Sequence, residues 1–175
     1  MESGSRQFGM CCPCEVNSFS GYGVMLEIED VTLLPDGRSL VNTIGGRRFK
    51  VLNRGTKDGY STAKVVWLKD DSCSEDETEI IRKRQLSIYA NIVAWFSSLS
   101  IITKIQLFAE MGIPSSNPVC DHENVNNRNG PNWIWWALNL LPMPPSQKIQ
   151  IISMTDIRQR LDKIEQFFRQ ITDAS

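Results

Sequence analysis

The chain has 175 residues, 41% of them hydrophobic, which is enough for one domain with a substantial core. Its 19 lysines and arginines nearly balance its 20 aspartates and glutamates, so the net charge of −1 excludes a whole-chain attraction to nucleic acid or anionic membranes. Five unevenly spaced cysteines exclude the dense, even framework of a secreted disulfide-rich domain. We therefore expect free thiols and an intracellular, cytoplasmic protein.

The first motif along the chain is C-x-P-C, in which Cys11 and Cys14 have the spacing of redox pairs and of zinc-ligand pairs. A thioredoxin-type site requires a helix after the first cysteine, whereas the sequence EVNSFSGYG that follows does not favour one. A zinc site would need a second pair, and Cys120 with His122 is the one candidate, separated by a tighter gap than usual. We interpret Cys11 as the end of a strand and Cys12 to Cys14 as the start of a turn, and we predict no metal and no cofactor.

Residues 8 to 70 carry the signals of several short strands. The sequence GVMLEIEDVTLL alternates apolar and charged residues, and LPDGRS follows it as a turn. In that turn Pro35 presets φ, Asp36 can bond its own backbone, and Gly37 tolerates a left-handed conformation. Closely spaced strands with turn signals between them predict a barrel or a sandwich.

The sequences SLVNTIGGRRFKVLNRG and YSTAKVVWLKD predict the remaining strands. The small basic patch Arg47, Arg48 and Lys50 lies on the first of them. Because side chains alternate between the two faces of a strand, we expect Phe49 to point inward, with Arg48 and Lys50 on the solvated face.

From about residue 77 onward the pattern becomes helical. The first helix is predicted to run to about Ser98 and to continue, kinked at the serines, to Met111. Residues 85–103 carry no charge and are just long enough to span a bilayer. Polar and small residues recur on one side, however, and large apolar residues on the other, so we predict an amphipathic core helix rather than a membrane span. The apolar side consists of Ile88, Ile92, Trp95, Phe96, Leu99 and Ile102.

Three shorter helical segments follow a loop that is rich in Pro, Asn and Ser. Pro131 stands where the first turn of a helix tolerates proline, before NWIWWALNLL. The sequence PMPPSQKIQIISM contains the second segment, and Thr155 is predicted to cap the third. The apolar stripe of the third is Ile157, Leu161, Ile164, Phe168 and Ile171. We expect the indoles of Trp133, Trp135 and Trp136 to pack against the strands, with one of them available to line a groove for a partner.

Strands first and helices second predict an α+β fold. The chain has no P-loop sequence and no G-x-S-x-G elbow. Its single histidine, His122, lies in the least structured loop, which is a poor place to hold catalytic geometry. The sequence therefore favours a protein that is not an enzyme, with no catalytic residue.

The sequence GYGVMLEIEDVTLLPDGRSLVNTIGGRRFKVLNRGTKDGYSTAKVVWLKD resembles the N-terminal, substrate-binding domain of Lon proteases through its L-P-D-G turn, its G-x-R-F-x-V strand and its W-L-K-D ending. The resemblance is closer to the LON peptidase N-terminal domain and RING finger proteins, which are ubiquitin ligases. It extends over RQFGMC, KDGYSTA, GPNWIWWALNLLPMPPSQKIQIISM and RQRLDKI, and so over nearly the whole chain.

This resemblance implies a PUA-like β-barrel over residues 1–72, followed by a helical sub-domain of the same domain over residues 73–175. It implies a non-catalytic module that recognises protein substrates, tied to ubiquitin ligation or protein quality control. Any ligase activity would reside in a RING finger of a longer chain, since eight Cys and His ligands are needed and this chain has 5 cysteines and 1 histidine. The alternative is a nucleic-acid-binding PUA-like module, which the near-neutral charge disfavours.

In the resembling family a helix and one or more barrel strands precede the segment that starts here. We therefore expect an N-terminally truncated, incomplete barrel. Its open edges would present unpaired backbone groups, which predicts marginal stability or self-association. The binding residues themselves are not identified by the sequence.

Overall fold

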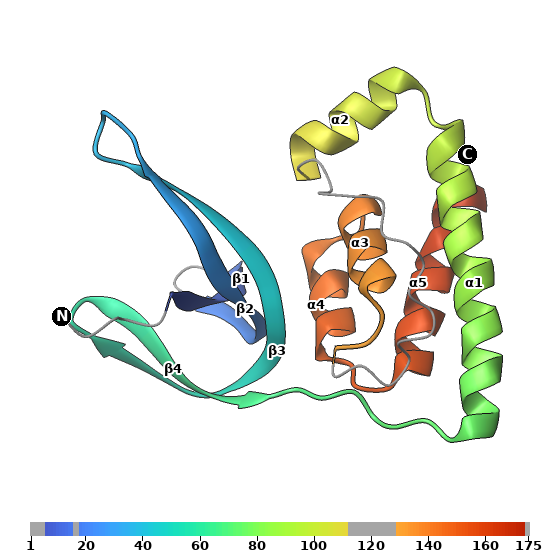
Figure 1. The fold of residues 1–175 in the computed structure, drawn as a ribbon, viewed down its shortest axis with the longest axis horizontal. Helices are drawn as coiled ribbons and strands as arrows, with labels where there is room; N and C mark the ends of the chain where they lie inside the picture. Colours follow the sequence, from blue (N-terminus) through green and yellow to red (C-terminus); the bar gives the residue numbers. More distant parts are fainter. Residues whose placement is uncertain (1–5, 16–17, 112–128, 174–175) are drawn as a thin grey trace. The chain divides into compact units, whose positions relative to one another are not determined.

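The computed structural model describes residues 6–15, 18–111 and 129–173. Within these described residues four strands come first along the chain and five helices follow, which confirms the α+β class (Figure 1). The chain divides into two compact units, Met1–Leu68 and Lys69–Ser175, which we call the sheet unit and the helical unit.

The sheet unit is a single antiparallel sheet in which each strand pairs with its neighbours in sequence. The strands are β1 (Gln7–Glu15), β2 (Ser18–Leu33), β3 (Ser39–Lys57) and β4 (Tyr60–Trp67), in the spatial order β1-β2-β3-β4. Within the described residues β1 and β4 are edges, so the sheet is open, in agreement with the expected incomplete barrel. Figure 1 shows the long β2 and β3 curving together through the unit.

Both turns that connect the long strands follow from local chemistry. In the β2–β3 turn Gly37 has a φ of +84°, and Asp36 Oδ1 accepts a hydrogen bond from the Arg38 N–H at 3.0 Å, as the sequence predicts. The β3–β4 turn consists of Asp58 and Gly59, whose φ angles are +51° and +82°. A two-residue turn with both φ values positive matches the twist of the flanking strands and closes a tight hairpin.

The prediction that a turn begins at Cys12 is wrong, because β1 continues through Cys12, Pro13 and Cys14 to Glu15. Its pairing with β2 shifts register between Cys11 and Pro13 and again between Pro13 and Glu15. Proline has no N–H to give to a ladder, and it is therefore accommodated in an edge strand or at a bulge rather than ending the strand.

The prediction of which β3 side chains are buried and which are exposed is correct for two of the three residues. Phe49 is buried and Lys50 is exposed, as predicted, but Arg48 is also buried, against the expectation of a solvated side chain. The chain that leaves β4 runs beside this position, because the Leu68 N–H donates to the Arg48 carbonyl at 2.9 Å. This neighbouring segment leaves the Arg48 position less open than alternation along β3 alone would suggest.

The helical unit contains α1 (Glu75–Ser98), α2 (Ile101–Met111), α3 (Asn132–Leu140), α4 (Pro145–Ser153) and α5 (Ile157–Asp173). A capping box starts α1: the Ser74 hydroxyl accepts from the Glu77 N–H, and the Glu77 carboxylate accepts from the Ser74 N–H. The chain then breaks at Leu99 and Ser100, as the predicted kink requires, and α2 leaves at 111° to α1.

The amphipathic pattern of α1 is confirmed, since Ile88 and Ile92 are buried while Ser87 and Asn91 are exposed. The pattern fails beyond the break, where Ile102 is 66% exposed because α2 has turned away from the α1 axis. Among the described residues no single helix has the length and apolarity of a membrane span. By length and composition alone, α1 and residues 101–109 of α2 would pass as one bent pair.

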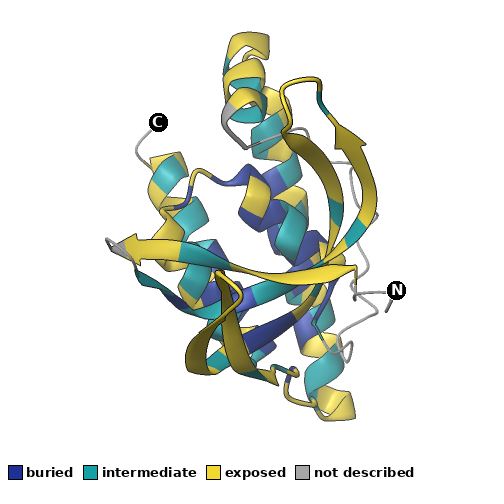
Figure 2. Ribbon diagram, turned by 90° about the vertical axis from the view of Figure 1, so that its left-hand side faces the viewer, coloured by how far each residue is buried: buried dark blue, intermediate teal, exposed yellow. Residues whose placement is uncertain are grey.

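The largest part of the buried core lies in the helical unit, where the helices of Figure 2 carry most of the buried colour. Its centre is apolar, and within it Trp133 Nε1 donates to Gln85 Oε1 at 2.8 Å. The core consists of Ile81, Ile88, Ile92, Trp133, Ile134, Ala137, Leu138, Leu140, Leu141, Met143, Ile151, Ile157, Leu161 and Ile164.

The predicted stripe of α5 lies on this core, with Ile157, Leu161 and Ile164 buried. The predicted cap is wrong by one residue. Asp156 Oδ1 accepts from the Arg158 N–H at 2.8 Å and so caps the helix, whereas the Thr155 hydroxyl donates to Asp71 Oδ2 at 3.0 Å.

The tryptophans of α3 pack within the helical unit, which corrects the expectation of packing on strands. Trp133 is fully buried, and the Tyr89 ring of α1 meets it edge-on with centroids 5.9 Å apart. Tyr89 also contacts Trp136, at 6.0 Å. Trp135 is half-buried, and its Nε1 donates to the Asn129 carbonyl at 3.1 Å.

Candidate functional site

The sheet unit contains a hollow of about 310 Å³ on one face of the curved sheet, which we call the sheet hollow. All four strands contribute to it. It is lined by Gly9, Cys11, Phe19, Met25, Phe49, Val51, Ser61, Thr62, Ala63 and Val65. Most of these side chains are apolar or small, so the hollow offers an apolar surface with few hydrogen-bonding groups.

The floor of the hollow is set by the Phe49 ring, which lies across two glycines of neighbouring strands. A Cβ atom on Gly9 would stand 3.0 Å from Phe49 Cζ. On Gly23 it would stand 2.6 Å from the same atom and would overlap the Met10 carbonyl oxygen. Glycine is therefore required at Gly23 by close approach, and the missing side chains create the space that Phe49 fills.

Two arginines flank the hollow, and each lies over an aromatic ring. The Arg54 guanidinium is 4.5 Å from the centroid of the Phe19 ring and donates to the Phe19 carbonyl oxygen. The Arg47 guanidinium is 4.5 Å from the centroid of the Trp67 ring, which itself meets Phe49 edge-on at 6.4 Å. The contacts hold both cations beside the apolar surface, where they favour an acidic group on a bound molecule.

The cysteine motif meets the hollow only through Cys11. Burial raises the pKa of its thiol, the Arg54 charge opposes that shift, and Cys14 adds to it. A redox or nucleophilic cysteine needs a lowered pKa, so Cys11 stays protonated at neutral pH and acts as a small lining group. Within the part of the chain that the structure describes, no three His, Cys, Asp or Glu residues are grouped for a metal. Cys120 and His122 lie outside the described residues.

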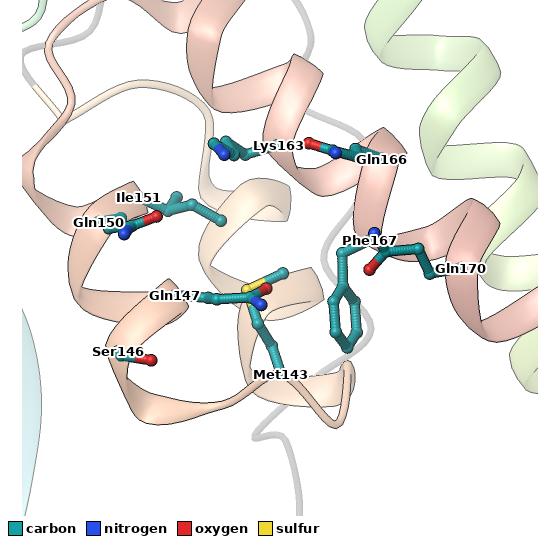
Figure 3. A pocket seen from close by; sticks show the side chains of 9 residues that line it. All are labelled: Met143, Ser146, Gln147, Gln150, Ile151, Lys163, Gln166, Phe167 and Gln170. Atoms are coloured by element: carbon teal, nitrogen blue, oxygen red, sulfur yellow. The ribbon is translucent and has the colours of Figure 1, made fainter.

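A second hollow, of about 340 Å³, lies in the helical unit between α4 and α5 (Figure 3). Polar side chains dominate its lining, with the Phe167 ring and Met143 at one end. It is lined by Met143, Ser146, Gln147, Gln150, Ile151, Lys163, Gln166, Phe167 and Gln170. This groove has no cluster of titratable groups that would perform acid–base chemistry.

The motifs that carry the family resemblance meet at a buried ion pair in the helical unit. Arg160 Nη1 and Nη2 donate to the two Asp70 carboxylate oxygens at 2.9 and 2.7 Å, and Nη2 also donates to the Met154 carbonyl at 2.8 Å. The guanidinium lies 4.9 Å from the Trp135 ring centroid. A Cβ on Gly130, whose φ is +73°, would stand 2.6 Å from Arg160 Nη1.

This ion pair is a structural element rather than a site, because its side chains are 0% and 2% exposed. Asp70 ends W-L-K-D, Arg160 lies in RQRLDKI, and Gly130 and Trp135 belong to GPNWIWW. These residues join the segment after β4 to the N-terminal turn of α5, and the Asp71 N–H reinforces the junction by donating to the Thr155 carbonyl at 3.0 Å.

The family model of the substrate-binding domain of ATP-dependent protease La (Lon) matches residues 1–170. The chain belongs to this family. Among solved structures, a Lon N-terminal domain protein from Xanthomonas campestris is 20% identical, with a TM-score of 0.52. The match covers 91% of this chain and 74% of that one. The N-terminal domain of the Mycobacterium avium complex Lon protease is 12% identical, with a TM-score of 0.58, over 93% of this chain and 76% of that one.

For this Lon substrate-binding domain the family assignment agrees with the geometry of the site. The sheet hollow offers an apolar surface and flanking charge, and its thiol and hydroxyl groups (Cys11, Ser61 and Thr62) have no histidine or carboxylate beside them among the lining residues. Sequence reasoning left the binding residues unidentified. The glycines of RQFGMC and GYGVM were the available signal, because isolated glycines inside a strand indicate close approach of another group.

Proposed function

We propose that this Lon substrate-binding domain recognises segments of other proteins that present apolar side chains, and that it does so without catalysing a reaction on them. The main support for the proposal is the sheet hollow, a largely apolar cavity of about 310 Å³. The family to which the chain belongs is described as a substrate-binding domain. Large exposed apolar patches mark interaction sites on proteins, and 11 of the 16 exposed large hydrophobic side chains among the described residues belong to the sheet unit that contains this hollow.

The test is binding of the 175-residue chain to a permanently unfolded polypeptide, such as a reduced and alkylated model protein, with the native disulfide-bonded form of that protein as the control. Ala63→Glu places a charge in the hollow at an exposed edge position. Val66→Glu makes the same change in charge at a β4 residue outside the hollow and serves as the matched variant. We expect the first to weaken binding to the unfolded protein by about tenfold or more, and the second to leave it largely intact. Equal binding by both variants would contradict the proposal.

The finer proposal concerns the larger protein in which such a domain would act. The motifs GPNWIWWALNLLPMPPSQKIQIISM and RQRLDKI resemble those of RING-type ubiquitin ligases, in which this domain would select the protein to be modified. Cysteine usage supports an intracellular, cytoplasmic location. Affinity capture from cytosol with the wild type and with Ala63→Glu would test the ligase proposal. The proteins that the wild type captures and Ala63→Glu does not should include proteins that become ubiquitylated.

Self-association through the two open edges of the sheet is a further proposal, because unpaired strands can pair with a second copy. Sedimentation velocity over a range of protein concentrations measures it directly. A monomer at every concentration would exclude this route and leave the edges available to other proteins.

A further inference from the structure

The two edges of the sheet differ in how well they could accept another strand. The edge strand β1 contains Pro13, which lacks an N–H, and it has two register shifts. The other edge strand, β4, has 8 residues without proline, and its register with β3 is continuous from Tyr60 to Lys64. Prolines and bulges are devices that protect an edge from further pairing. Edge β1 has a proline and two register shifts in its ladder, whereas β4 has no proline and its ladder with β3 has one shift, between Val51 and Asn53.

The unpaired backbone of β4 adjoins the sheet hollow. The two-residue turn at Asp58 and Gly59 makes Lys57 and Tyr60 the pair that closes the hairpin. Alternation along an antiparallel ladder then directs the N–H and C=O groups of Ser61, Ala63 and Val65 to the open side. The same three residues line the hollow. A strand added at this edge would therefore place every second side chain beside the apolar surface.

Charge distinguishes the two halves of the sheet as well. From residue 45 to residue 67 the chain has six basic residues (Arg47, Arg48, Lys50, Arg54, Lys57 and Lys64) and the single acid Asp58. Over β1 and β2 it has four acids (Glu15, Glu27, Glu29 and Asp30) and no lysine or arginine. Arg48 is buried, and the other five basic side chains are exposed. Since β3 and β4 are adjacent, the β4 side of the sheet is basic and attracts an acidic partner.

We infer that β4 binds an extended, acidic segment of a partner protein by strand addition, with alternate apolar side chains of that segment lying over the sheet hollow. This inference rests on the proposed function and specifies its substrate class. Backbone pairing to β4 supplies affinity, and the hollow and the lysines supply the preference for side chains. A second copy of this chain fits less well, because its other edge strand, β1, has only one acid, Glu15, and contains Pro13.

Single-stranded RNA is the other acidic polymer that a basic surface attracts, but the aromatic rings here are poorly placed for it. Nucleic-acid-binding sheets use exposed aromatic faces on which bases stack. Arg54 covers one face of Phe19, and Arg47 covers one face of Trp67. A strand edge also presents a row of N–H and C=O groups that match a polypeptide and not a phosphate backbone.

The experiment measures fluorescence anisotropy of a labelled eight-residue peptide in which valine and glutamate alternate, titrated with the 175-residue chain. Three comparison probes share the format: valine alternating with lysine, the acidic peptide with N-methylated backbone nitrogens on one edge, and a uridine oligonucleotide. We expect saturable binding of the acidic peptide and binding weaker by about fivefold or more for the first two comparison probes. N-methylation removes backbone pairing without altering the protein, so this arm stays decisive even if a variant folds poorly.

Two variants locate the site. Ala63→Pro removes an N–H that faces the open edge, and proline is tolerated at such positions, so this variant should keep its circular dichroism spectrum and lose peptide binding. Lys64→Glu should weaken binding of the acidic peptide by about fivefold and strengthen binding of the basic peptide.

The inference is overturned if the N-methylated peptide binds as well as its parent, if a folded Ala63→Pro binds normally, or if the uridine oligonucleotide binds more tightly than the peptide. Sedimentation velocity that shows β4-dependent dimers in place of peptide binding would also overturn it. The proposed function and the strand-addition inference can fail independently of each other. If Ala63→Glu still abolishes binding to the unfolded protein while Ala63→Pro does not, the hollow binds substrate and the strand-addition mode is wrong.

Discussion

The two units of the chain differ in how far their apolar side chains are buried. Fourteen of the buried hydrophobic side chains in the described residues form the helical core, while the sheet unit contributes Phe49. Conversely, 11 of the 16 exposed large hydrophobic side chains belong to the sheet unit. The helical unit uses its hydrophobic residues to stabilise itself, and the sheet unit keeps most of its own on the surface, where another chain can reach them.

The largest expected effect concerns the buried ion pair of the helical unit. Arg160→Met leaves the Asp70 carboxylate buried without its bidentate partner, and we expect the free energy of unfolding to fall by about 3–5 kcal/mol. Urea denaturation followed by helical circular dichroism measures this. Arg158→Met removes an exposed guanidinium that pairs with Asp156 and Glu77, and should cost less than about 1 kcal/mol. Equal losses for the two variants would show that the Arg160 site does not secure the unit.

Leu161→Ala and Ile164→Ala test whether the α5 stripe belongs to one closed core. Both side chains are 0% exposed, and each truncation should lower the free energy of unfolding by about 2–5 kcal/mol. Thermal and urea unfolding give the values, with the exposed Gln159→Ala as the control, for which we expect less than about 0.5 kcal/mol. Midpoints like that of the wild type in both variants would mean that this face of α5 is a docking surface.

Gly23→Ala tests whether the sheet unit is closely packed at the point where β1, β2 and Phe49 meet. A Cβ there would overlap the Met10 carbonyl and crowd Phe49, so we expect a loss of about 1–3 kcal/mol. At Gly21 a Cβ would meet nothing within 4 Å, which makes Gly21→Ala the matched control. Near-UV circular dichroism and urea unfolding compare the two. A neutral Gly23→Ala would refute close packing at this point.

The smallest effect is the pH dependence of the helical unit. Hydrogen bonding from Arg84, at 2.7 Å, lowers the pKa of Glu165, against partial burial and with help from Arg169. A carboxyl whose folded pKa lies below its unfolded value stabilises the fold fully above the unfolded pKa. It loses that contribution as the pH falls through the folded value. We therefore expect the free energy of unfolding to decline below about pH 4.

Glu165→Gln should flatten that decline, and the exposed Glu79→Gln should alter it less. Urea unfolding between neutral and acid pH gives the two slopes. Identical slopes for Glu165→Gln and the wild type would exclude the Arg84 pair as a source of acid sensitivity.

The sequence was most informative about features that depend on neighbouring residues, namely the hydrophobic periodicity of helices and the residue types of tight turns. The stripe of α5, the amphipathic α1 and the Pro35 to Gly37 turn are set by residues within a few positions of one another, and all were predicted. The choice between Thr155 and Asp156 as a cap was not predictable, because both residue types cap helices and tertiary contact with Asp71 decided it.

The features that escaped prediction depend on distant residues. Arg160 lies within the apolar stripe between Ile157 and Ile164, and a charge at that position signals a buried partner, but nothing local identifies Asp70. The sheet hollow depends on register across four strands, including the shift between Val51 and Asn53 on β3. A shift of one residue exchanges the faces of a strand, so alternation alone could not identify the lining residues.

The ion pair between Asp70 and Arg160 has a consequence for the order of events during synthesis. Each strand of the sheet pairs with the next one along the chain, so its hairpins can form soon after they emerge from the ribosome. Asp70, however, is separated by 90 residues from the arginine that neutralises it. At ordinary elongation rates that interval is on the order of ten seconds. During that time a growing chain would present the apolar strands to the surrounding solvent while the helices still lack the cation that completes their core.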